Sequence, residues 1–421
     1  MKPKTFMLIA GEASGDLLAA ELVAALREQS SILVTPKQSE GGLHPPSSPL
    51  FFGAGGAKMS AAGMELAFDL TQHSVIGITD VLKNLLKFRR LFKQLLALAI
   101  ERKPDVVIGV DYGGFNLRFG QAVKKYVREN PFSTWNPKIV QFVSPQVWAS
   151  RPGRADKLAR DYDLLLSIFP FEKAWYAQRV PQLRVEFVGH PMIGRFTNDD
   201  LRFTRRDSES SRSRGDETQI KEKLETPHVV SYKNILLLPG SRKGELQRHL
   251  PVMLDAVKVI QEKLPAAKVK MVLPNLGLKE LADRLSALQS GVEIQIGELP
   301  WALAEADVAI ASTGTVTMEC AFFRVPTVTL YKTSWLTYQI ARRIVTVKSL
   351  TMPNLLAGET VFPEFIQNDA TPENLSRAAL ELLQDESRRA KIKAQLAKII
   401  SSLGEPGAAG RAAAAVLSLF G

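Results

Sequence analysis

The sequence predicts an α/β protein with two doubly wound, Rossmann-like domains that face each other across a cleft. Short apolar runs alternate with longer amphipathic segments along most of the 421 residues, which is the pattern of parallel strands joined by helices. A segment rich in Arg, Asp, Glu and Ser interrupts this alternation at 198–231. We therefore expect an N-terminal domain at 1–197, a polar linker or insertion at 198–231, and a second domain at 232–421.

The composition limits the compartment and the partners. The single cysteine, Cys320, excludes an intramolecular disulfide and argues against a cysteine-based metal site, which fits a reducing cytoplasm. The first apolar run, Phe6 to Ala10, is too short for a signal peptide, and no segment reaches about 18 uncharged apolar residues, so we expect no transmembrane helix. The formal net charge of +11 favours an anionic partner, which on charge alone is nucleic acid, a phospholipid surface or a phosphorylated substrate.

The first strand, Phe6 to Ala10, runs into a glycine-rich turn and then a helix from about 17 to 29. Ligands of open α/β sheets bind at the carboxyl ends of the strands. Polar side chains of this turn are therefore predicted to bind substrate: Glu12, Ser14 and Asp16. Capping of the helix explains Ser14 and Asp16 equally well. The Gly, Pro and Ser of 36–49 predict a solvated loop.

The most amphipathic segment is the predicted helix at 80–102. Large aliphatic and aromatic side chains cover a wide arc of it, and lysines and arginines occupy much of the remainder, as in helices that lie in the interface of an anionic membrane. The residues predicted to contact the membrane are Leu85, Lys87, Phe88, Arg90, Phe92 and Lys93. A core-facing helix with a solvated basic face is an equally good interpretation.

The next strand, Val106 to Val110, is fully apolar and ends in Asp111. An acid at the tip of a buried strand occupies the place of catalytic residues in α/β sheets, so Asp111 is the candidate general base. A role in a turn or a helix cap is the alternative. Three more strands are predicted in this half, at 139–143, 164–168 and 184–188.

In the second half, two strands end in turns suited to phosphate. The strand Ile235 to Leu238 leads into Gly240, Ser241 and Arg242, and the strand Val308 to Ala311 leads into a turn that holds Gly314 and Thr315. Backbone N–H groups at such turns, the guanidinium of Arg242 and the helix N-termini favour an anion, although helix capping alone also explains the second turn. One helical turn after Thr315 comes Glu319, which could accept hydrogen bonds from a sugar.

The remaining elements continue the same alternation. Strands are predicted at 269–273, 293–296 and 325–331, and terminal helices at 374–383 and 387–403, the last of which could pack back on the first domain. The segment Leu350 to Gly358 is expected to be an extended loop from which Asn354 contacts the ligand. These features together predict a sugar-nucleotide transferase that acts on an amphiphilic acceptor.

Several short motifs occur together and in order across nearly the whole chain: GEASGD at 11–16, Asp111 with Phe115 and Asn116, SPQVW at 144–148, GHP at 189–191, LPGSR at 238–242, the stretch 312–319, and PNLLAG at 353–358. They resemble the lipid-A-disaccharide synthase family, inverting glycosyltransferases with the GT-B fold. Two positions depart from the pattern, because Gly113 stands where the family usually has Pro and Ser150 where it often has an aromatic residue.

The resemblance implies transfer of 2,3-diacylglucosamine from UDP to 2,3-diacylglucosamine 1-phosphate, giving a β-1,6-linked disaccharide 1-phosphate and UDP. Asp111 would be the base, Arg242 would bind the diphosphate and Glu319 the ribose. Gly314, Thr315 and Asn354 would complete the donor site, and Glu12 would hold a sugar. No metal or other cofactor and no nucleic acid are implied. The protein would be peripheral on the cytoplasmic face of the inner membrane, with a homodimer suggested.

Other classes of function stay open at this point. One is another GT-B enzyme that uses a UDP-sugar, such as the peptidoglycan-precursor N-acetylglucosamine transferase or a UDP-sugar epimerase. The other is a non-catalytic basic protein that binds a membrane or a nucleic acid. An epimerase needs no amphipathic basic helix like that predicted at 80–102. A non-catalytic protein has no reason to place Asp111 and Arg242 at strand ends.

Overall fold

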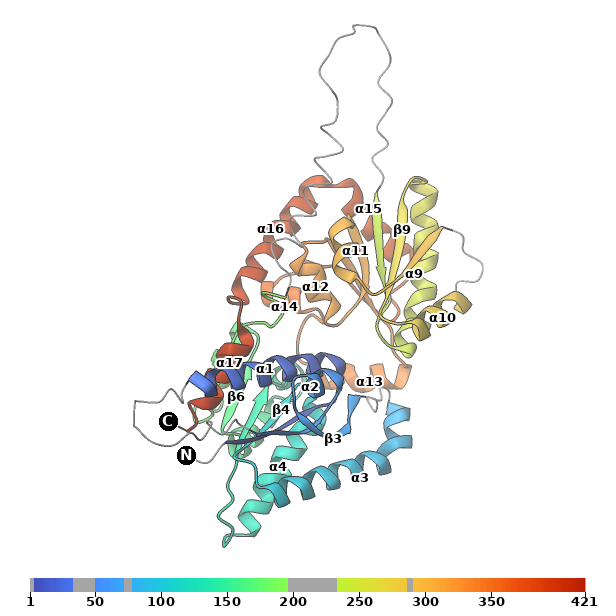
Figure 1. Ribbon diagram of the computed structural model, residues 1–421. Coiled ribbons are helices and arrows are strands. Elements are labelled where there is room, and N and C mark those ends of the chain that lie inside the picture. Colours follow the sequence, from blue (N-terminus) through green and yellow to red (C-terminus); the bar gives the residue numbers. More distant parts are fainter. Residues whose placement is uncertain (1–3, 33–49, 72–77, 196–232, 286–290, 421) are drawn as a thin grey trace, which may run out of the picture. The chain divides into compact units, whose positions relative to one another are not determined.

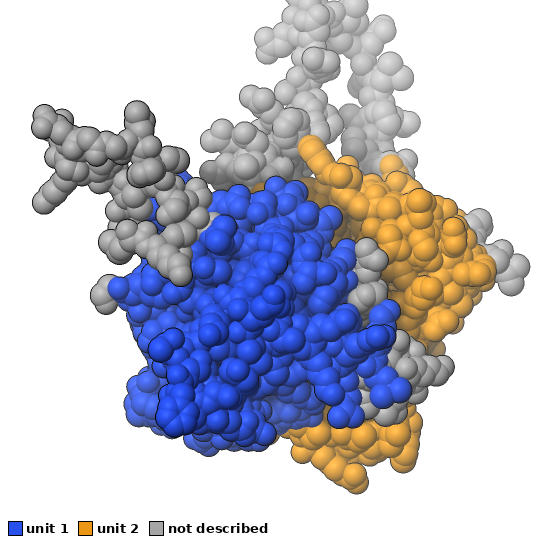
Figure 2. Space-filling model, turned by 60° about the horizontal axis from the view of Figure 1, so that its bottom comes forward, with its two compact units in different colours: residues 1–194, 403–421 blue, residues 195–402 orange. Residues whose placement is uncertain are grey.

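The computed structural model describes residues 4–32, 50–71, 78–195, 233–285 and 291–420. The chain forms two compact units, which Figure 2 colours blue and orange. Unit 1 consists of residues 1–194 and 403–421, and unit 2 of residues 195–402. The segments 36–49 and 198–231, expected to be a loop and a linker, lie outside the described residues.

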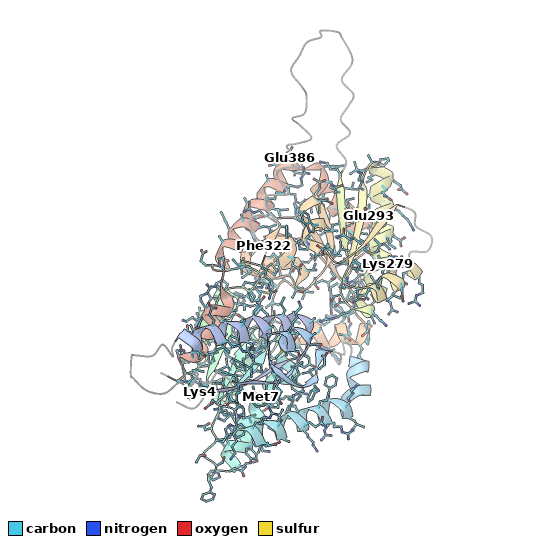
Figure 3. The ribbon with its side chains drawn as sticks, viewed as in Figure 1. Lys4, Met7, Lys279, Glu293, Phe322 and Glu386 are labelled. Carbon is cyan, nitrogen blue, oxygen red and sulfur yellow. The ribbon has the colours of Figure 1, made fainter. Side chains whose placement is uncertain are left out.

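Unit 1 contains a seven-stranded parallel sheet in the order β3-β2-β1-β4-β5-β6-β7. Its strands are β1 (Thr5–Ala10), β2 (Leu50–Gly55), β3 (Glu65–Asp69), β4 (Val106–Val110), β5 (Lys138–Phe142), β6 (Leu164–Ser167) and β7 (Val185–Phe187). The central strands are apolar on both faces because helices cover both faces of the sheet, and Met7 of β1 is fully buried in this core (Figures 1 and 3).

Two strands of unit 1, β2 and β3, are absent from the sequence prediction. The strand β2 is hard to recognise in the sequence because it contains glycines, which usually indicate turns. Gly53 has φ +145°, and a Cβ atom there would lie 2.0 Å from the carbonyl oxygen of Leu8. Only glycine allows this close approach of the two backbones. The strand β3 lies at the edge of the sheet, and its five residues, ELAFD, begin and end with an acid, so its apolar run is only three residues long and gives a weak strand signal.

The helices of unit 1 are α1 (Ala13–Ile32), α2 (Ala57–Ala61), α3 (Ile78–Arg102), α4 (Gly113–Glu129), α5 (Val147–Ser150), α6 (Ala155–Asp161), α7 (Pro170–Ala177) and α17 (Ala408–Leu417). The last of these packs along α1 (Figure 1), where Gln29 Nε2 donates to the carbonyl oxygen of Gly410 at 2.8 Å. Arg411 fixes the same segment, because its Nε donates to the carbonyl oxygen of Val188 at 2.8 Å. Residues distant in the sequence thus complete one unit.

Unit 2 contains a six-stranded parallel sheet in the order β10-β9-β8-β11-β12-β13. Its strands are β8 (Asn234–Leu238), β9 (Lys268–Leu273), β10 (Val292–Ile296), β11 (Val308–Ser312), β12 (Thr327–Tyr331) and β13 (Glu364–Ile366). Its helices are α9 (Lys243–Lys263), α10 (Leu276–Leu285), α11 (Leu299–Glu305), α12 (Val316–Phe322), α13 (Trp335–Ile344), α14 (Met352–Ala357), α15 (Pro372–Gln384) and α16 (Glu386–Ser402).

The segment Leu350 to Gly358 is not the extended loop that the sequence predicts, because it contains the helix α14. Pro353 lies in the first turn of that helix, where its missing N–H costs no hydrogen bond. Gly358 ends the helix with φ +70°. Across the described residues, no helix is long and apolar enough to cross a membrane.

Candidate active site

Each sheet has a topological switch point, where neighbouring strands have connections that leave in opposite directions. It lies between β1 and β4 in unit 1, and between β8 and β11 in unit 2. Ligands of open parallel sheets bind outside the carboxyl ends of these strands. Residues 11–16, which include the first turn of α1, follow β1, and Asp111 follows β4, while the turn 240–242 follows β8 and the turn 313–315 follows β11. The predicted site loops therefore occupy the two switch points.

Asp111 is held in a strained backbone conformation at the end of β4. It has φ +50°, a region that few residues other than glycine adopt, and Tyr112 after it has φ +46°. Two buried amide side chains clamp its carbonyl oxygen, since Asn116 Nδ2 donates to it at 2.8 Å and Gln141 Nε2 at 2.9 Å. The N–H of Asp111 donates to the carbonyl oxygen of Phe142 at 2.8 Å. The clamp therefore holds the backbone from which the carboxylate projects.

The carboxyl group of Asp111 has a raised pKa, and burial is the main cause. Hydrogen bonds from the Tyr112 N–H and the Ser14 hydroxyl favour the charged form and partly offset this rise. A general base works best when its pKa lies near the operating pH, so the direction of the shift suits proton abstraction. The contact with Ser14 also joins the turn after β1 to the end of β4.

Gly11 lies against the ring of Tyr112, and the charge of Glu12 acts on the phenol group of the same residue. A Cβ atom at Gly11 would stand 2.4 Å from Tyr112 Cδ1, so only glycine fits beneath the ring. Burial is the main cause of the raised pKa of Tyr112, and the charge of Glu12 adds to it. Glu12 is therefore within electrostatic reach of Tyr112 at the end of β4.

Asp16 has a different environment from the other predicted substrate-binding residues. It is buried, and its carboxylate accepts from the N–H groups of Gly56 at 2.7 Å, Lys58 at 3.0 Å and Met59 at 3.1 Å. These are the first amides of α2, so Asp16 satisfies the start of that helix. Any contact of Asp16 with substrate would compete with these hydrogen bonds.

The loop 144–148 is tied to the helix α7 through Glu172, which the sequence analysis did not identify. Trp148 Nε1 donates to Glu172 Oε1 at 3.0 Å, and the Phe169 N–H donates to Glu172 Oε2 at 3.3 Å. The Ser144 hydroxyl donates to Tyr176 Oη at 3.1 Å. Burial raises the pKa of Glu172 to about 7 despite these hydrogen bonds. An acid four residues after the end of a predicted strand gave no periodic or motif signal.

In unit 2, the turn after β8 presents Ser241 and Arg242 at the start of the long helix α9. Gly240 has φ +119°, and a Cβ atom there would lie 2.5 Å from Glu245 Oε2. Ser241 is exposed, and Arg242 is half-buried with its Nη1 3.2 Å from Glu245 Oε1. The turn therefore offers a hydroxyl, a guanidinium and the positive end of α9 in one place.

His249, which the sequence analysis also missed, connects this turn to the end of β12. Its Nε2 accepts from the Lys332 N–H at 3.0 Å, so its Nδ1 carries the proton and donates to the carbonyl oxygen of Pro239 at 2.9 Å. Burial lowers the pKa of His249, which keeps the ring neutral and preserves both bonds. The turn after β8 is thereby held in a fixed shape.

The turn after β11 exposes Gly314 and Thr315, and Gly314 has φ +140°. The Thr317 hydroxyl donates to the Gly314 carbonyl oxygen at 2.7 Å, which stabilises the turn. Burial raises the pKa of Glu319 to about 7, and the charge of Arg195 opposes this rise. Glu319 is therefore an acid that gains or loses its charge near neutral pH. Within the described part of the chain, no group of three or more His, Cys, Asp and Glu is arranged to hold a metal.

Asn354 is buried, and residues of the same unit occupy both the donor and the acceptor atoms of its side chain. Its Nδ2 donates to the Phe362 carbonyl oxygen and to Glu364 Oε1, each at 2.8 Å. Its Oδ1 accepts from the N–H groups of Val361 and Phe362, again at 2.8 Å. Asn354 thus braces the segment before β13, and an effect on donor binding would pass through that segment.

The predicted membrane-contacting residues of α3 divide between two environments. Leu86 is 80% exposed, and the cations that follow it, Lys87, Arg90 and Lys93, are exposed as well. Phe88 is half-buried, and the side chain of Leu85 lies outside the described residues. Phe92 instead faces the core of unit 1, where its ring centre is 5.3 Å from that of Phe115 and 5.5 Å from that of Phe119. We therefore remove Phe92 from the membrane-contacting set.

Comparison with known proteins supports this picture. A family model described as lipid-A-disaccharide synthetase matches residues 6–418. A lipid-A-disaccharide synthase of Myxococcus xanthus (strain DK1622) is 34% identical over 421 residues, which cover 99% of this chain and 98% of the relative. One of Trichlorobacter lovleyi (strain ATCC BAA-1151 / DSM 17278 / SZ) is 35% identical over 422 residues, again covering 99% and 98%.

Solved structures with the same fold include a glycotransferase of kitacinnamycin, with a TM-score of 0.58, 17% identity and full coverage of both chains. A UDP-GlcNAc 2-epimerase from Neisseria meningitidis bound to UDP-GlcNAc has a TM-score of 0.56 and 12% identity, and the match covers 99% of this chain and 100% of that one. These likenesses confirm the predicted GT-B fold.

Proposed function

The chain belongs to the lipid-A-disaccharide synthase family and is a glycosyltransferase, and on this premise we propose which of its residues transfer 2,3-diacylglucosamine from UDP to 2,3-diacylglucosamine 1-phosphate. One observation supports the assignment most strongly. In each unit, the segments that carry the proposed catalytic and donor-binding residues Asp111, Arg242 and Gly314 follow the two strands that flank the switch point of the sheet. The acceptor is assigned to the switch point of unit 1 and the UDP-sugar donor to that of unit 2.

In the acceptor half, Asp111 takes the proton of the acceptor's 6-hydroxyl group. The hydroxyl oxygen forms a bond to the anomeric carbon of the donor while the bond from that carbon to the UDP oxygen breaks, which inverts the configuration. The raised pKa of Asp111 makes it a stronger base than an exposed carboxylate. Glu12 and Ser14 line the same strand ends, and Ser14 orients the carboxylate through its hydrogen bond.

In the donor half, the exposed turns after β8 and β11 bind the UDP group. Arg242 and the N-terminus of α9 lie together and would stabilise the negative charge that develops on the leaving diphosphate. Gly314 and Thr315 offer backbone N–H groups on an exposed turn, and Glu319 accepts hydrogen bonds from the ribose in its charged form. His249 keeps the turn of Arg242 in place.

The decisive experiment is to incubate the protein with UDP-2,3-diacylglucosamine and 2,3-diacylglucosamine 1-phosphate and to search for the disaccharide 1-phosphate by mass spectrometry. A parallel reaction with UDP-N-acetylglucosamine and a lipid-linked peptidoglycan precursor distinguishes the closest rival activity. Disaccharide in the first reaction alone supports the proposal. Product in the second alone would replace it with the peptidoglycan transferase.

Both substrates carry acyl chains, so we propose that the protein works as a peripheral protein on the cytoplasmic face of the inner membrane. The exposed cations of α3, at Lys87, Arg90 and Lys93, support contact with an anionic lipid surface. The neighbouring Leu86 offers an apolar side chain for the same surface. This contact would bring unit 1 to the lipid acceptor.

A further inference from the structure

The helix α13 of unit 2 has no buried residue among its ten. Trp335 is 72% exposed, Leu336 61% and Ile340 43%, so large apolar side chains lie open within six positions of one another. The helix is nevertheless well formed, and Ser334 caps it by accepting from the Thr337 N–H at 3.3 Å. Other residues of the helix, such as Tyr338 and Ile344, are half-buried, so the helix rests on unit 2 on one side and exposes its large apolar side chains on the other. A cluster of exposed large apolar side chains is typical of a surface that contacts another molecule or a membrane.

Two exposed arginines share that face. At about 100° per residue, Trp335, Leu336, Ile340, Arg342 and Arg343 fall within an arc of about 160°. Aromatic and aliphatic side chains with interspersed cations are the composition of helices that lie in the interface of a membrane. The surrounding segment has the same charge bias, because residues 331–358 contain four Lys and Arg and no Asp or Glu. The charge of the face therefore complements an anionic surface.

The helix also starts on the side of the sheet where the strands have their carboxyl ends, which is the side that carries the candidate donor site. It follows β12, which pairs with β11, and β11 in turn pairs with β8. The turns 312–315 and 240–242 leave the same edge, because the strands are parallel. The Lys332 N–H, just before α13, donates to His249 of α9 at 3.0 Å, which links the approach to α13 with the turn of Arg242.

We propose that α13 is a membrane-contacting helix of unit 2 that lies in the interface of an anionic lipid bilayer. Trp335, Leu336 and Ile340 insert among the upper acyl chains, and Arg342 and Arg343 pair with lipid phosphates. The reason for such a contact rests on the proposed function, since a donor with two acyl chains has to enter unit 2 without exposing them to water. The contact is separate from that of α3, which belongs to unit 1.

The first test measures partitioning of the full chain onto vesicles of phosphatidylcholine with 30% phosphatidylglycerol, by sedimentation, with pure phosphatidylcholine as the neutral reference. The double variant Arg342→Glu, Arg343→Glu should bind the anionic vesicles at least about thirtyfold more weakly than the unaltered chain. The matched control Lys391→Glu, Lys393→Glu makes the same charge change at exposed positions of α16 and should lose much less. Equal loss in the two variants, or no loss in either, would overturn the proposal.

The second test follows the apolar residues. The tryptophan emission of the full chain should shift to the blue when anionic vesicles are added, and Trp335→Phe should remove most of this shift while binding stays close to normal. The variant Trp335→Ser should weaken binding several-fold, whereas Leu276→Ser, at an exposed position of α10, should not. A blue shift that persists in Trp335→Phe would show that another tryptophan enters the lipid and would refute the insertion of α13.

Two further outcomes separate this inference from its alternatives. Light scattering of the double arginine variant should give the mass of the unaltered chain; a change from oligomer to monomer with normal vesicle binding would make α13 an interface between copies and would refute the membrane assignment. Turnover with detergent-dispersed substrates should be unaffected by the α13 variants. If no variant or parent makes disaccharide, the proposed function fails, while a vesicle result specific to α13 still stands.

Discussion

The two hydrogen bonds that hold the carbonyl oxygen of Asp111 lead to a prediction in which kcat falls while the free energy of unfolding stays nearly the same. The change is Gln141→Met, which keeps an unbranched side chain of similar length but has no amide. It removes the hydrogen bond from Gln141 Nε2 to the carbonyl oxygen of Asp111 at 2.9 Å, which is worth about 1 kcal/mol net, together with two longer contacts of the same atom, with the carbonyl oxygens of Phe142 and Val143 at 3.3 Å each. It also removes Gln141 Oε1, a buried oxygen without a hydrogen-bond partner in the described structure, whose burial costs about 1–3 kcal/mol.

These two effects nearly cancel in the free energy of unfolding, so Gln141→Met should be as stable as the parent chain or slightly more stable. The rate of transfer should nevertheless fall. Asp111 has φ +50°, which costs of the order of 1–3 kcal/mol, and loss of one of its two amide donors frees the backbone to relax. A loss of about 1.4 kcal/mol in positioning corresponds to a roughly tenfold drop in kcat, with KM little changed.

The assay is initial-rate disaccharide formation together with urea unfolding of the same preparations. Ser167→Ala is the matched control, since Ser167 is buried on the neighbouring strand β6 and its hydroxyl also lacks a partner in the described structure. That variant should keep kcat. A Gln141→Met protein with normal kcat, whether stable or not, would refute the idea that the clamp positions the base.

Four other predictions follow from the site. Asp111→Asn should abolish turnover and leave UDP binding intact in calorimetry, because the base is lost while the donor site is kept; normal turnover would remove Asp111 from the mechanism. Arg242→Ala should weaken UDP binding by about tenfold or more, and Lys243→Ala beside it should not; equal affinities would refute the diphosphate contact. Glu172 has a folded pKa of about 7, above its ordinary value of 4.5, so its contribution to stability is complete below pH 4.5 and is lost as the pH rises through 7. Glu172→Gln should therefore flatten the fall in the urea midpoint between pH 5 and pH 8, and an unchanged slope would contradict the shift. Charge reversal at Lys87, Arg90 and Lys93 of α3 should reduce sedimentation with anionic vesicles, and undiminished sedimentation would favour the purely core-facing interpretation of that helix.

The elements that the sequence predicts best are those with one dominant physical signal. The strand Val106–Val110 is apolar throughout and is found with the predicted bounds, because both faces of a central parallel strand are buried. Asp111 comes directly after such a strand and Arg242 comes four residues after another, so a simple rule about strand ends found two segments that lie at the switch points. The strand β2 was not predicted, because glycine usually indicates a turn. In this strand Gly53 instead allows the backbone to approach that of Leu8 closely.

The residues that support the site could not be found in this way. Gln141 lies in an apolar strand and His249 in the middle of a helix, and their roles depend on partners far along the chain, at Asp111 and Lys332. For Asn354, the motif predicts a contact with the ligand, and the structure adds hydrogen bonds from its side chain to the segment before β13 that the motif does not predict. Local pattern predicts where backbone elements end, whereas hydrogen-bond partners across the fold depend on tertiary packing.

The composition of unit 1 from two separate parts of the chain has a consequence for synthesis. Residues 403–421, including α17 against α1 and Arg411 against Val188, leave the ribosome only after all of unit 2 has been made. Unit 2 is one continuous stretch of the chain. Its synthesis begins after that of residues 1–194 but is complete before residues 403–421 of unit 1 are made. Until then, the side of α1 that contacts α17 in the finished fold stays uncovered. A ribosome that stalls within unit 2 would therefore leave this surface exposed to chaperones.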